Sequence, residues 1–354
     1  MWLRRIAKII GVFLGIILTL VLVLFCVAYF SKNASILLPV KHKDAFFAKD
    51  MDNFPDPLRV EGKALVGASG EPIVLKGLMP PDPSRLHKLN RFKKSFLEGI
   101  KETGANVVRI PVHPEEYSED EDYLWRYLDP TVAWAGELGM YVIIDWHYIG
   151  NIEDGSGGEM PDIDINPKEF SRQFWTLAAD YFKDAPNVIF EIFNEPANID
   201  AGIWAENAQE LVDIIRAQGA GQSIIVGGIN YSKDLSWVKG TPIDDENIIY
   251  ASHIYPAVNS LRWGDYFGEV AESHPVLITE WGFMDDNRST TEQYFLVGDE
   301  GSYGAPLLHY LEERGVGWIA CWFDETWEPQ IFHEDFKSYT SYGRFVMRKL
   351  SGTP

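Results

Sequence analysis

The sequence of 354 residues predicts a (β/α)8 barrel, an α/β fold, and two observations support this class. Eight short apolar runs, most of them rich in Val and Ile, alternate with helical stretches. Near-continuous apolar runs are typical of strands covered on both faces, and hence of a parallel sheet. An open doubly wound sheet is the main rival, but no G-x-G-x-x-G follows the first run. The eight runs span residues 73–78, 106–112, 141–147, 188–196, 223–231, 247–256, 275–283 and 317–324.

The segments between these runs carry helix signals. In the stretch 166–182, Asn166 is a good N-cap residue, and Pro167 suits the first helical position. Glu169 then occupies the third position, where an acidic residue completes a capping box. Another helical stretch ends on Gly315, which is typical of a C-cap.

The chain before the barrel divides into three parts. Residues 1–30 predict a membrane anchor, and the polar, aperiodic residues 31–57 predict a linker. Residues 58–78 then predict a hairpin that turns at Ser69–Gly70 and leads into the first barrel strand. The catalytic domain is therefore expected over residues 58–354.

The anchor prediction rests on an uncharged run from Ile9 to Phe30. About 20 apolar residues span a bilayer, so this run is long enough. A cleaved signal peptide would have a shorter run and a small-x-small cleavage site, which is missing here. Basic residues flank both ends, so charge alone gives no firm orientation. We expect a single-pass anchor with the barrel on the extracytoplasmic side, and secretion after cleavage is the alternative.

The charge of the chain excludes some partners. The formal net charge is −21, and the sequence pI is about 4.7. A nucleic-acid-binding protein should present a basic face, so no nucleic-acid partner is expected. The acidity also disfavours a polyanionic substrate.

Cysteine and metal-ligand patterns yield no site. Cys26 lies in the apolar run and Cys321 in the last strand, so no disulfide is expected. Residues 162–166 begin like a calcium loop, but Pro167 and Gln173 break that pattern. His and Cys spacings contain no zinc set. We expect neither a metal nor a cofactor.

The ends of six predicted strands carry polar or aromatic side chains. In a (β/α)8 barrel, sites are built where the strands reach their carboxyl ends. Any one such residue is a weak signal, but their convergence on one rim indicates a functional site. The residues are Arg109, His147, Asn194, Glu195, His253, Tyr255, Glu280 and Trp322.

Two carboxylates on one rim, those of Glu195 and Glu280, suggest glycoside hydrolysis. One acid protonates the leaving oxygen, while the other carboxylate attacks carbon or activates water. Their surroundings must separate the two pKa values. Arg109 is the cation suited to keep one carboxylate ionised, and Asn194 is a neutral donor for a sugar hydroxyl.

Six motifs in order along the chain resemble glycoside hydrolase family 5, the cellulase-like family: "VRIP", "DWH", "FNEP", "HIYP", "TEWGF" and "CWF". The resemblance covers Leu58 to Leu350 and leaves out the anchor. It implies a retaining double displacement, with Glu195 as acid/base and Glu280 as nucleophile. Their carboxyl groups should then lie ~5 Å apart, whereas an inverting pair needs roughly 6.5–9.5 Å.

The resemblance also implies roles for the other rim residues. Arg109 and Tyr255 would orient Glu280. Asn194 would bond the 2-hydroxyl of the sugar that is cleaved. The remaining three would line the same subsite, with the indole as its floor: His147, His253 and Trp322.

Aromatic residues are numerous, with 12 tryptophans and 16 tyrosines. Aromatic faces suit sugar rings, although most tryptophans are expected in the core. Trp281 directly follows Glu280, so it is the strongest further candidate for substrate contact. Trp263 and Trp327 come next, because they follow strands of the barrel.

We therefore expect a monomeric, membrane-anchored retaining glycosidase that acts on a β-linked polysaccharide or oligosaccharide. An endo-β-1,4-glucanase, that is a cellulase, is the preferred reading. β-Mannan, xyloglucan or β-1,3-glucan are alternative substrates for the same chemistry. A non-catalytic carbohydrate-binding barrel is the alternative of another class, but such a barrel has no need of two glutamates with Arg109 and Tyr255.

Overall fold

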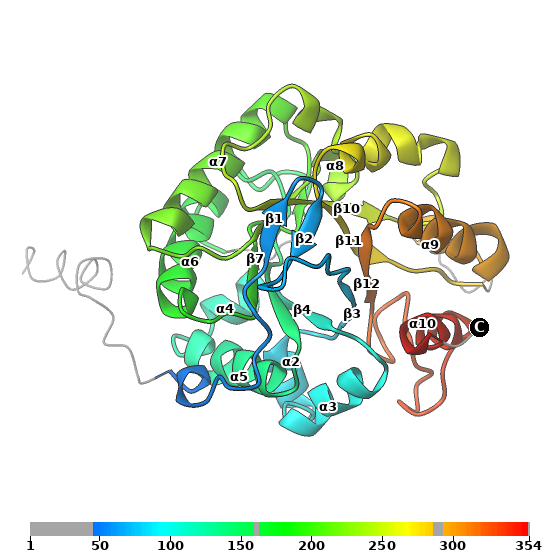
Figure 1. The fold of residues 1–354 in the computed structure, drawn as a ribbon, viewed down its shortest axis with the longest axis horizontal. Coiled ribbons are helices and arrows are strands. Elements are labelled where there is room, and N and C mark those ends of the chain that lie inside the picture. The colour runs from blue at the N-terminus through cyan, green and yellow to red at the C-terminus, as the bar shows by residue number, and fades with distance from the viewer. Residues whose placement is uncertain (1–44, 159–162, 286–292, 353–354) are drawn as a thin grey trace, which may run out of the picture. The chain divides into compact units, whose positions relative to one another are not determined.

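The structure, a computed structural model, describes residues 45–158, 163–285 and 293–352. Eight parallel strands close into a barrel with helices around it (Figure 1). Each strand overlaps one of the eight apolar runs, which confirms the predicted (β/α)8 fold. In their order around the barrel, the strands are β10 (Ile248–Ile254), β11 (Val276–Trp281), β12 (Gly317–Cys321), β3 (Lys76–Met79), β4 (Val107–Val112), β5 (Tyr141–Trp146), β7 (Val188–Glu191) and β9 (Ile224–Gly227).

The barrel strands are buried on both faces, as their apolar composition predicts. Successive side chains of a strand point to opposite faces, so one set fills the barrel and the other meets the helices. Ile143, Ile189, Ile225 and Ile319 belong to the inner cluster. This filling leaves the ends of the barrel as the places for polar chemistry.

Helices cover the outside of the barrel, and the sequence signals place two of them well. The side chain of Asn166 accepts hydrogen bonds from the N–H groups of Lys168 and Glu169, as the cap prediction requires. Gly315 lies three residues after Glu312, the last residue of the preceding helix, and has a φ of +65°. The α-helices are α2 (Pro83–Lys88), α3 (Lys94–Glu102), α4 (Pro114–Ser118), α5 (Asp129–Glu137), α6 (Pro167–Phe182), α7 (Ala201–Ala217), α8 (Ile229–Ser232), α9 (Ala305–Glu312) and α10 (Ser341–Ser351).

A short hairpin crosses one end of the barrel, in front of the strands in Figure 1. Its strands are β1 (Arg59–Glu61) and β2 (Ala64–Val66), so it turns at Gly62–Lys63 and not at the predicted Ser69–Gly70. Gly62 has a φ of +63°, a conformation that glycine adopts without a steric penalty. A second turn does lie at Ser69–Gly70, but it leads only to the isolated bridge between Val66 and Pro72.

The packed domain begins earlier than the predicted boundary at residue 58. Phe47 is buried and its ring contacts those of Tyr181 and Phe182. The carboxylate of Asp129 accepts hydrogen bonds from the backbone N–H groups of Phe46 and Phe47. Residues 45–57 are therefore part of the packed domain, which corrects the predicted extent of the linker.

The predicted anchor, residues 1–30, and the first part of the linker, residues 31–44, lie outside the described residues. Among the helices of residues 45–158, 163–285 and 293–352, none has the length and apolar character that a membrane span requires.

Candidate active site

The predicted rim residues meet at the carboxyl ends of the strands. Arg109 lies on β4 and Glu280 on β11, while Glu195 follows β7 in the short strand β8 (Glu195–Pro196). β8 pairs with β6 (Ile149–Gly150) in a separate two-stranded sheet. The register of β10 shifts before His253, and that of β11 shifts around Glu280. Such irregularities re-aim side chains beside sites.

Arg109 is fully buried and binds more acidic partners than predicted. Its guanidinium donates to both oxygens of Glu191, at 2.6 and 3.1 Å, and to Oε1 of Glu280 at 2.7 Å. It also donates to Oδ1 of Asn194 at 2.8 Å and lies 3.1 Å from Oδ2 of Asp145. Burial alone would lower the pKa of Arg109, but these carboxylates raise it well above its usual value. Arg109 is thus a permanent cation beneath the site.

Glu280 is held as an anion. Its Oε1 accepts from Arg109, and its Oε2 accepts from the Tyr255 hydroxyl at 2.9 Å. Burial would raise its pKa, but His253 and Arg109 outweigh this and bring the pKa down to about 2. An ionised, doubly hydrogen-bonded carboxylate is suited to nucleophilic attack.

Glu195 has the opposite electrostatics. Burial raises its pKa, the Glu280 charge adds to this, and His253 opposes it. The Nδ1 atom of His253 lies 2.8 Å from Oε1 of Glu195. Only 14% of the Glu195 side chain is exposed, so the carboxyl group is largely removed from water. A carboxylic acid that retains its proton can donate it to a leaving group.

The two carboxyl groups are close enough for a retaining pair. One oxygen of Glu195, one of Glu280 and a ring nitrogen of His253 all lie within 4.8 Å of one another. Retaining glycosidases hold their carboxyl groups about 5–5.5 Å apart, and inverting ones about 6.5–9.5 Å. The same trio is close enough to ligate a metal, but Arg109 and Tyr255 already bond both oxygens of Glu280. The geometry therefore favours an acid/base and nucleophile pair.

His147 is neutral and has a defined tautomer. Burial lowers its pKa well below the usual value. Its Nδ1 lies 2.5 Å from Oδ2 of Asp145, which also faces Arg109. When Asp145 is ionised its oxygen can only accept, so Nδ1 then carries the proton and Nε2 is left as an acceptor. An acceptor at this point of the rim suits a substrate hydroxyl.

Trp322 lies at the mouth of the inner cluster, with 9% of its surface exposed. Its ring stands nearly perpendicular to that of Trp327, with ring centroids 4.6 Å apart. The centroid of the His147 ring lies 5.8 Å from that of Trp322. The guanidinium of Arg85 covers Trp327 at 4.4 Å, and His113 contacts its ring. The predicted floor is thus continuous with a wall of further rings.

Trp281 does not face the rim, so the prediction of substrate contact is wrong. It is fully buried against Trp318, Tyr342 and Phe345 in the outer core. Leu277 lies in the inner cluster and Ile278 in the outer one, so regular alternation would point Trp281 inward; the register shift between Ile278 and Trp281 reverses this and turns Trp281 outward.

The sequence analysis missed Asp145 and Glu191, the two further buried carboxylates beside Arg109. Burial raises the pKa of each to about 7, although Arg109 opposes the shift. Strand alternation could have found Asp145, because it lies two residues before His147 and so faces the same side. Glu191 is the last residue of the otherwise apolar strand β7 and is fully buried, where a carboxylate needs a cation.

Tyr231 is a third residue that the sequence analysis missed. It lies in α8, where Asn230, Tyr231 and Ser232 have φ values of 57°, 61° and 52°. Left-handed backbone is unfavourable outside glycine, and such outliers cluster at functional sites. The Ser232 hydroxyl donates to the carbonyl of Asn194, next to Glu195. α8 therefore packs against β8, and the Tyr231 side chain is 47% exposed, with its hydroxyl donating to the carbonyl oxygen of Gly157 at 3.2 Å.

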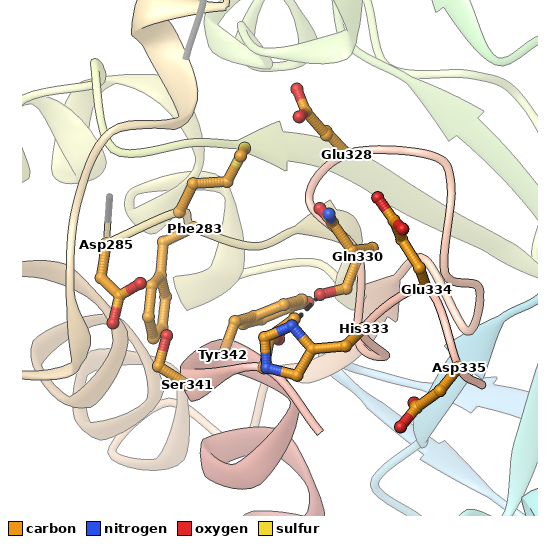
Figure 2. Close-up of a pocket in the computed structure, with 11 residues that line it drawn as sticks. Phe283, Asp285, Glu328, Gln330, His333, Glu334, Asp335, Ser341 and Tyr342 are labelled. Carbon is orange, nitrogen blue, oxygen red and sulfur yellow. Dashed lines mark hydrogen bonds between the residues drawn. The ribbon is translucent and has the colours of Figure 1, made fainter. Parts of the chain in front are cut away.

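A cavity of about 470 Å³ lies between the loops that follow β11 and β12. Figure 2 shows Phe283 and Asp285 on one side of it and His333, Glu334 and Asp335 on the other. Glu328 adds a fourth carboxylate, and no lysine or arginine is among the described residues that line it. Neither Glu195 nor Glu280 lines the cavity, but its acidic walls disfavour anionic ligands at the β11 side of the rim.

Relatives in sequence match 64% and 75% of this chain. The chain is 31% identical over 252 residues to Endoglucanase A of Butyrivibrio fibrisolvens. This alignment covers 64% of this chain and 52% of that protein. It is 29% identical over 281 residues to an endoglucanase of Clostridium saccharobutylicum, with coverages of 75% and 56%. The chain thus spans about half the length of these two curated relatives.

Solved structures share the fold. The β-glucanase SdGluc5_26A of Saccharophagus degradans, determined in complex with cellotetraose, superposes with a TM-score of 0.80 at 26% identity. This match covers 88% of this chain and 97% of that one. The catalytic domain of Thermobifida fusca endoglucanase Cel5A superposes with a TM-score of 0.68 at 21% identity, covering 83% and 97%. The model of the family described as Cellulase (glycosyl hydrolase family 5) matches residues 66–324. This chain therefore belongs to glycosyl hydrolase family 5.

Proposed function

We propose that this chain hydrolyses β-1,4-linked glucan within the polymer, with retention of anomeric configuration. The observation that carries the proposal is the glutamate pair, with oxygens of both residues within 4.8 Å and pKa values moved in opposite directions. A binding protein would have no use for that separation of pKa values. The alternative of a non-catalytic barrel is disfavoured for this reason.

In the first step, Oε of the Glu280 carboxylate attacks the anomeric carbon, and the bond to the leaving oxygen breaks. Glu195 gives its proton to that oxygen. In the second step, Glu195 takes a proton from water, which attacks the anomeric carbon and displaces Glu280. Arg109 and Tyr255 fix the nucleophile, and the neutral His147 supplies an acceptor for a sugar hydroxyl.

Three observations support a neutral β-glucan as substrate. Relatives in sequence are named endoglucanases, and a similar solved β-glucanase was determined with cellotetraose. The rim offers aromatic surface in Trp322 and Trp327, and α8, which carries the exposed Tyr231, packs against the Glu195 strand β8. The acidic cavity next to β11 disfavours uronic acids. β-Mannan, xyloglucan and β-1,3-glucan are the competing substrates.

The test is a panel of polymers assayed with the wild-type chain, Glu195→Gln and Glu280→Gln. We expect the largest kcat/KM on β-1,4-glucan, a rapid fall in viscosity that marks internal cleavage, and β-configured products by NMR. Both variants should lose at least about 100-fold in kcat, the lower end of what a positioned acid or base contributes. Equal activity in wild type and both variants would contradict the proposal.

We also propose that the apolar run Ile9–Phe30 anchors a monomeric enzyme, with the barrel on the extracytoplasmic side. The length of the uncharged run supports the anchor, and an insoluble polymer substrate supports the orientation. The full chain should sediment with membranes after carbonate washing and should be cleaved by protease added to intact cells. Recovery of a shortened chain from the medium would favour cleavage and secretion.

A further inference from the structure

We propose that Cys321 is a positioning residue for the nucleophile: its thiol fixes the Tyr255 hydroxyl, which in turn bonds Glu280. This inference deepens the proposed function and rests on it. Cys321 is the last residue of β12, directly before Trp322, and it is fully buried in the inner cluster.

The contacts form a chain of three groups. Sγ of Cys321 lies 3.2 Å from the Tyr255 hydroxyl oxygen, which lies 2.9 Å from Oε2 of Glu280. A phenol has one proton, and the carboxylate can only accept, so Tyr255 donates to Glu280. The thiol proton is then the one that can bond the phenol oxygen.

The alternative acceptor for the thiol is weaker. The carbonyl oxygen of Trp281 lies 3.5 Å from Sγ, farther than the phenol oxygen. That carbonyl already accepts a hydrogen bond from the Tyr342 hydroxyl at 2.9 Å. The phenol oxygen of Tyr255 is therefore the acceptor that gains more from the S–H group.

The thiol keeps its proton over the working range. Burial raises the pKa of Cys321, and the neighbouring Glu280 charge raises it further. Cys321 therefore remains a neutral donor while Glu280 remains an anion. A thiolate at this place would instead repel the nucleophile and accept the Tyr255 proton.

Without the thiol, Tyr255 loses its second partner and gains room to move. Its bond to Glu280 then weakens, and Glu280 binds a proton more readily, so the acidic limb of kcat/KM moves to higher pH. The other ionisable groups that face Glu280 are unchanged by this substitution: Arg109 on β4, Asp145 on β5, His147 after β5, Glu195 on β8 and His253 on β10.

The kinetic test compares Cys321→Ala, Cys321→Val and Cys321→Ser. The first two lack a donor, and valine nearly keeps the volume, so both should lose three- to tenfold in kcat/KM, about the effect of one hydrogen bond. Serine keeps a donor and should restore most of the activity and the wild-type acidic limb. The matched control is Ile319→Val, which removes volume from the same strand inside the barrel. It should lower stability without moving the limb.

A double-mutant cycle with Tyr255→Phe isolates the interaction, because the phenylalanine has no hydroxyl for the thiol to fix. In that background, Cys321→Ala should have no further effect on kcat/KM. Equal losses in both backgrounds, or an unchanged acidic limb in both Cys321→Ala and Cys321→Val, would overturn the assignment.

An infrared measurement tests the bond without any activity. The S–H stretching band that disappears in Cys321→Ser should shift to higher frequency in Tyr255→Phe, since the thiol loses its acceptor. A band that stays unchanged in Tyr255→Phe would overturn the assignment even in an active enzyme. Wild-type inactivity on every glycan would contradict the proposed function instead, and the infrared result would stand apart from it.

Discussion

Replacing Arg109 with methionine should cost more stability than any single change at the barrel surface. The guanidinium contacts Glu191, Glu280 and Asn194 at 2.6–3.1 Å and lies 3.1 Å from Asp145, with no exposure to water. Removing one partner of a buried ion pair costs about 3–5 kcal/mol, because it leaves uncompensated charge. Methionine fills the space of the aliphatic stem, so little cavity cost is added. We expect the free energy of unfolding at neutral pH to fall by about 3–5 kcal/mol.

The pH dependence of this loss has a definite sign. Asp145 and Glu191 have pKa values of about 7 because of burial, against ordinary values of 3.8 and 4.5, and Arg109 opposes the shift. Removing Arg109 raises both pKa values further. A carboxyl group with a raised folded-state pKa stabilises the fold below its unfolded pKa, and this stabilisation is lost as pH rises through the folded one. The part of the Arg109→Met deficit that comes from these two groups should therefore grow as pH rises above about 7, and it should shrink as pH falls back toward that value.

Urea denaturation at several pH values would measure this, with Arg109→Lys as the matched control. Lysine keeps the charge but lacks the planar fork, so its loss should be smaller at every pH. A loss below about 1 kcal/mol in Arg109→Met, or a deficit that grows on acidification, would refute the reasoning.

Three further predictions concern the rim. The kcat/KM profile should fall at low pH, because Glu280 takes up a proton with a pKa of about 2. It should also fall at high pH, because Glu195, whose pKa is raised, loses its proton. A profile without a basic limb would contradict the acid role of Glu195. Tyr231→Ala should lower kcat/KM on polymer about three- to tenfold, whereas Tyr231→Phe keeps the ring and most activity; equal loss in both would argue against stacking. Trp281→Phe should lower the melting temperature and leave KM unchanged within about twofold, whereas Trp322→Ala should raise KM. A larger change of KM in Trp281→Phe would contradict the outward packing of Trp281.

The barrel could be predicted because its signals are local. Continuous Val and Ile runs mark buried parallel strands, and the cap at Asn166 is formed by residues close in sequence. The hairpin was misplaced because Gly62 and Gly70 both have positive φ, and only tertiary contacts decide which turn pairs two strands. Residues 45–57 were read as linker because Phe47 finds its partners far away in the sequence.

The site likewise has features that the sequence predicts and features that only the structure shows. Residues at strand ends could be named, since topology brings those ends together. The direction in which a side chain points is harder to predict, because the irregular register of β11 decides that Glu280 points into the barrel and Trp281 away from it. The partners of Arg109 and the thiol beneath Tyr255 depend on distances across the barrel, which no spacing in the sequence specifies.

Trapping the covalent intermediate tests the central claim most directly. A 2-deoxy-2-fluoro-β-cellobioside with an activated leaving group should inactivate the enzyme, and peptide mass spectrometry should locate the sugar on Glu280. Glu280→Gln should take up no label, and Glu195→Gln should still be labelled, because an activated leaving group needs no proton. Label on another residue, or hydrolysis of the substrate with inverted configuration, would contradict the double displacement through Glu280.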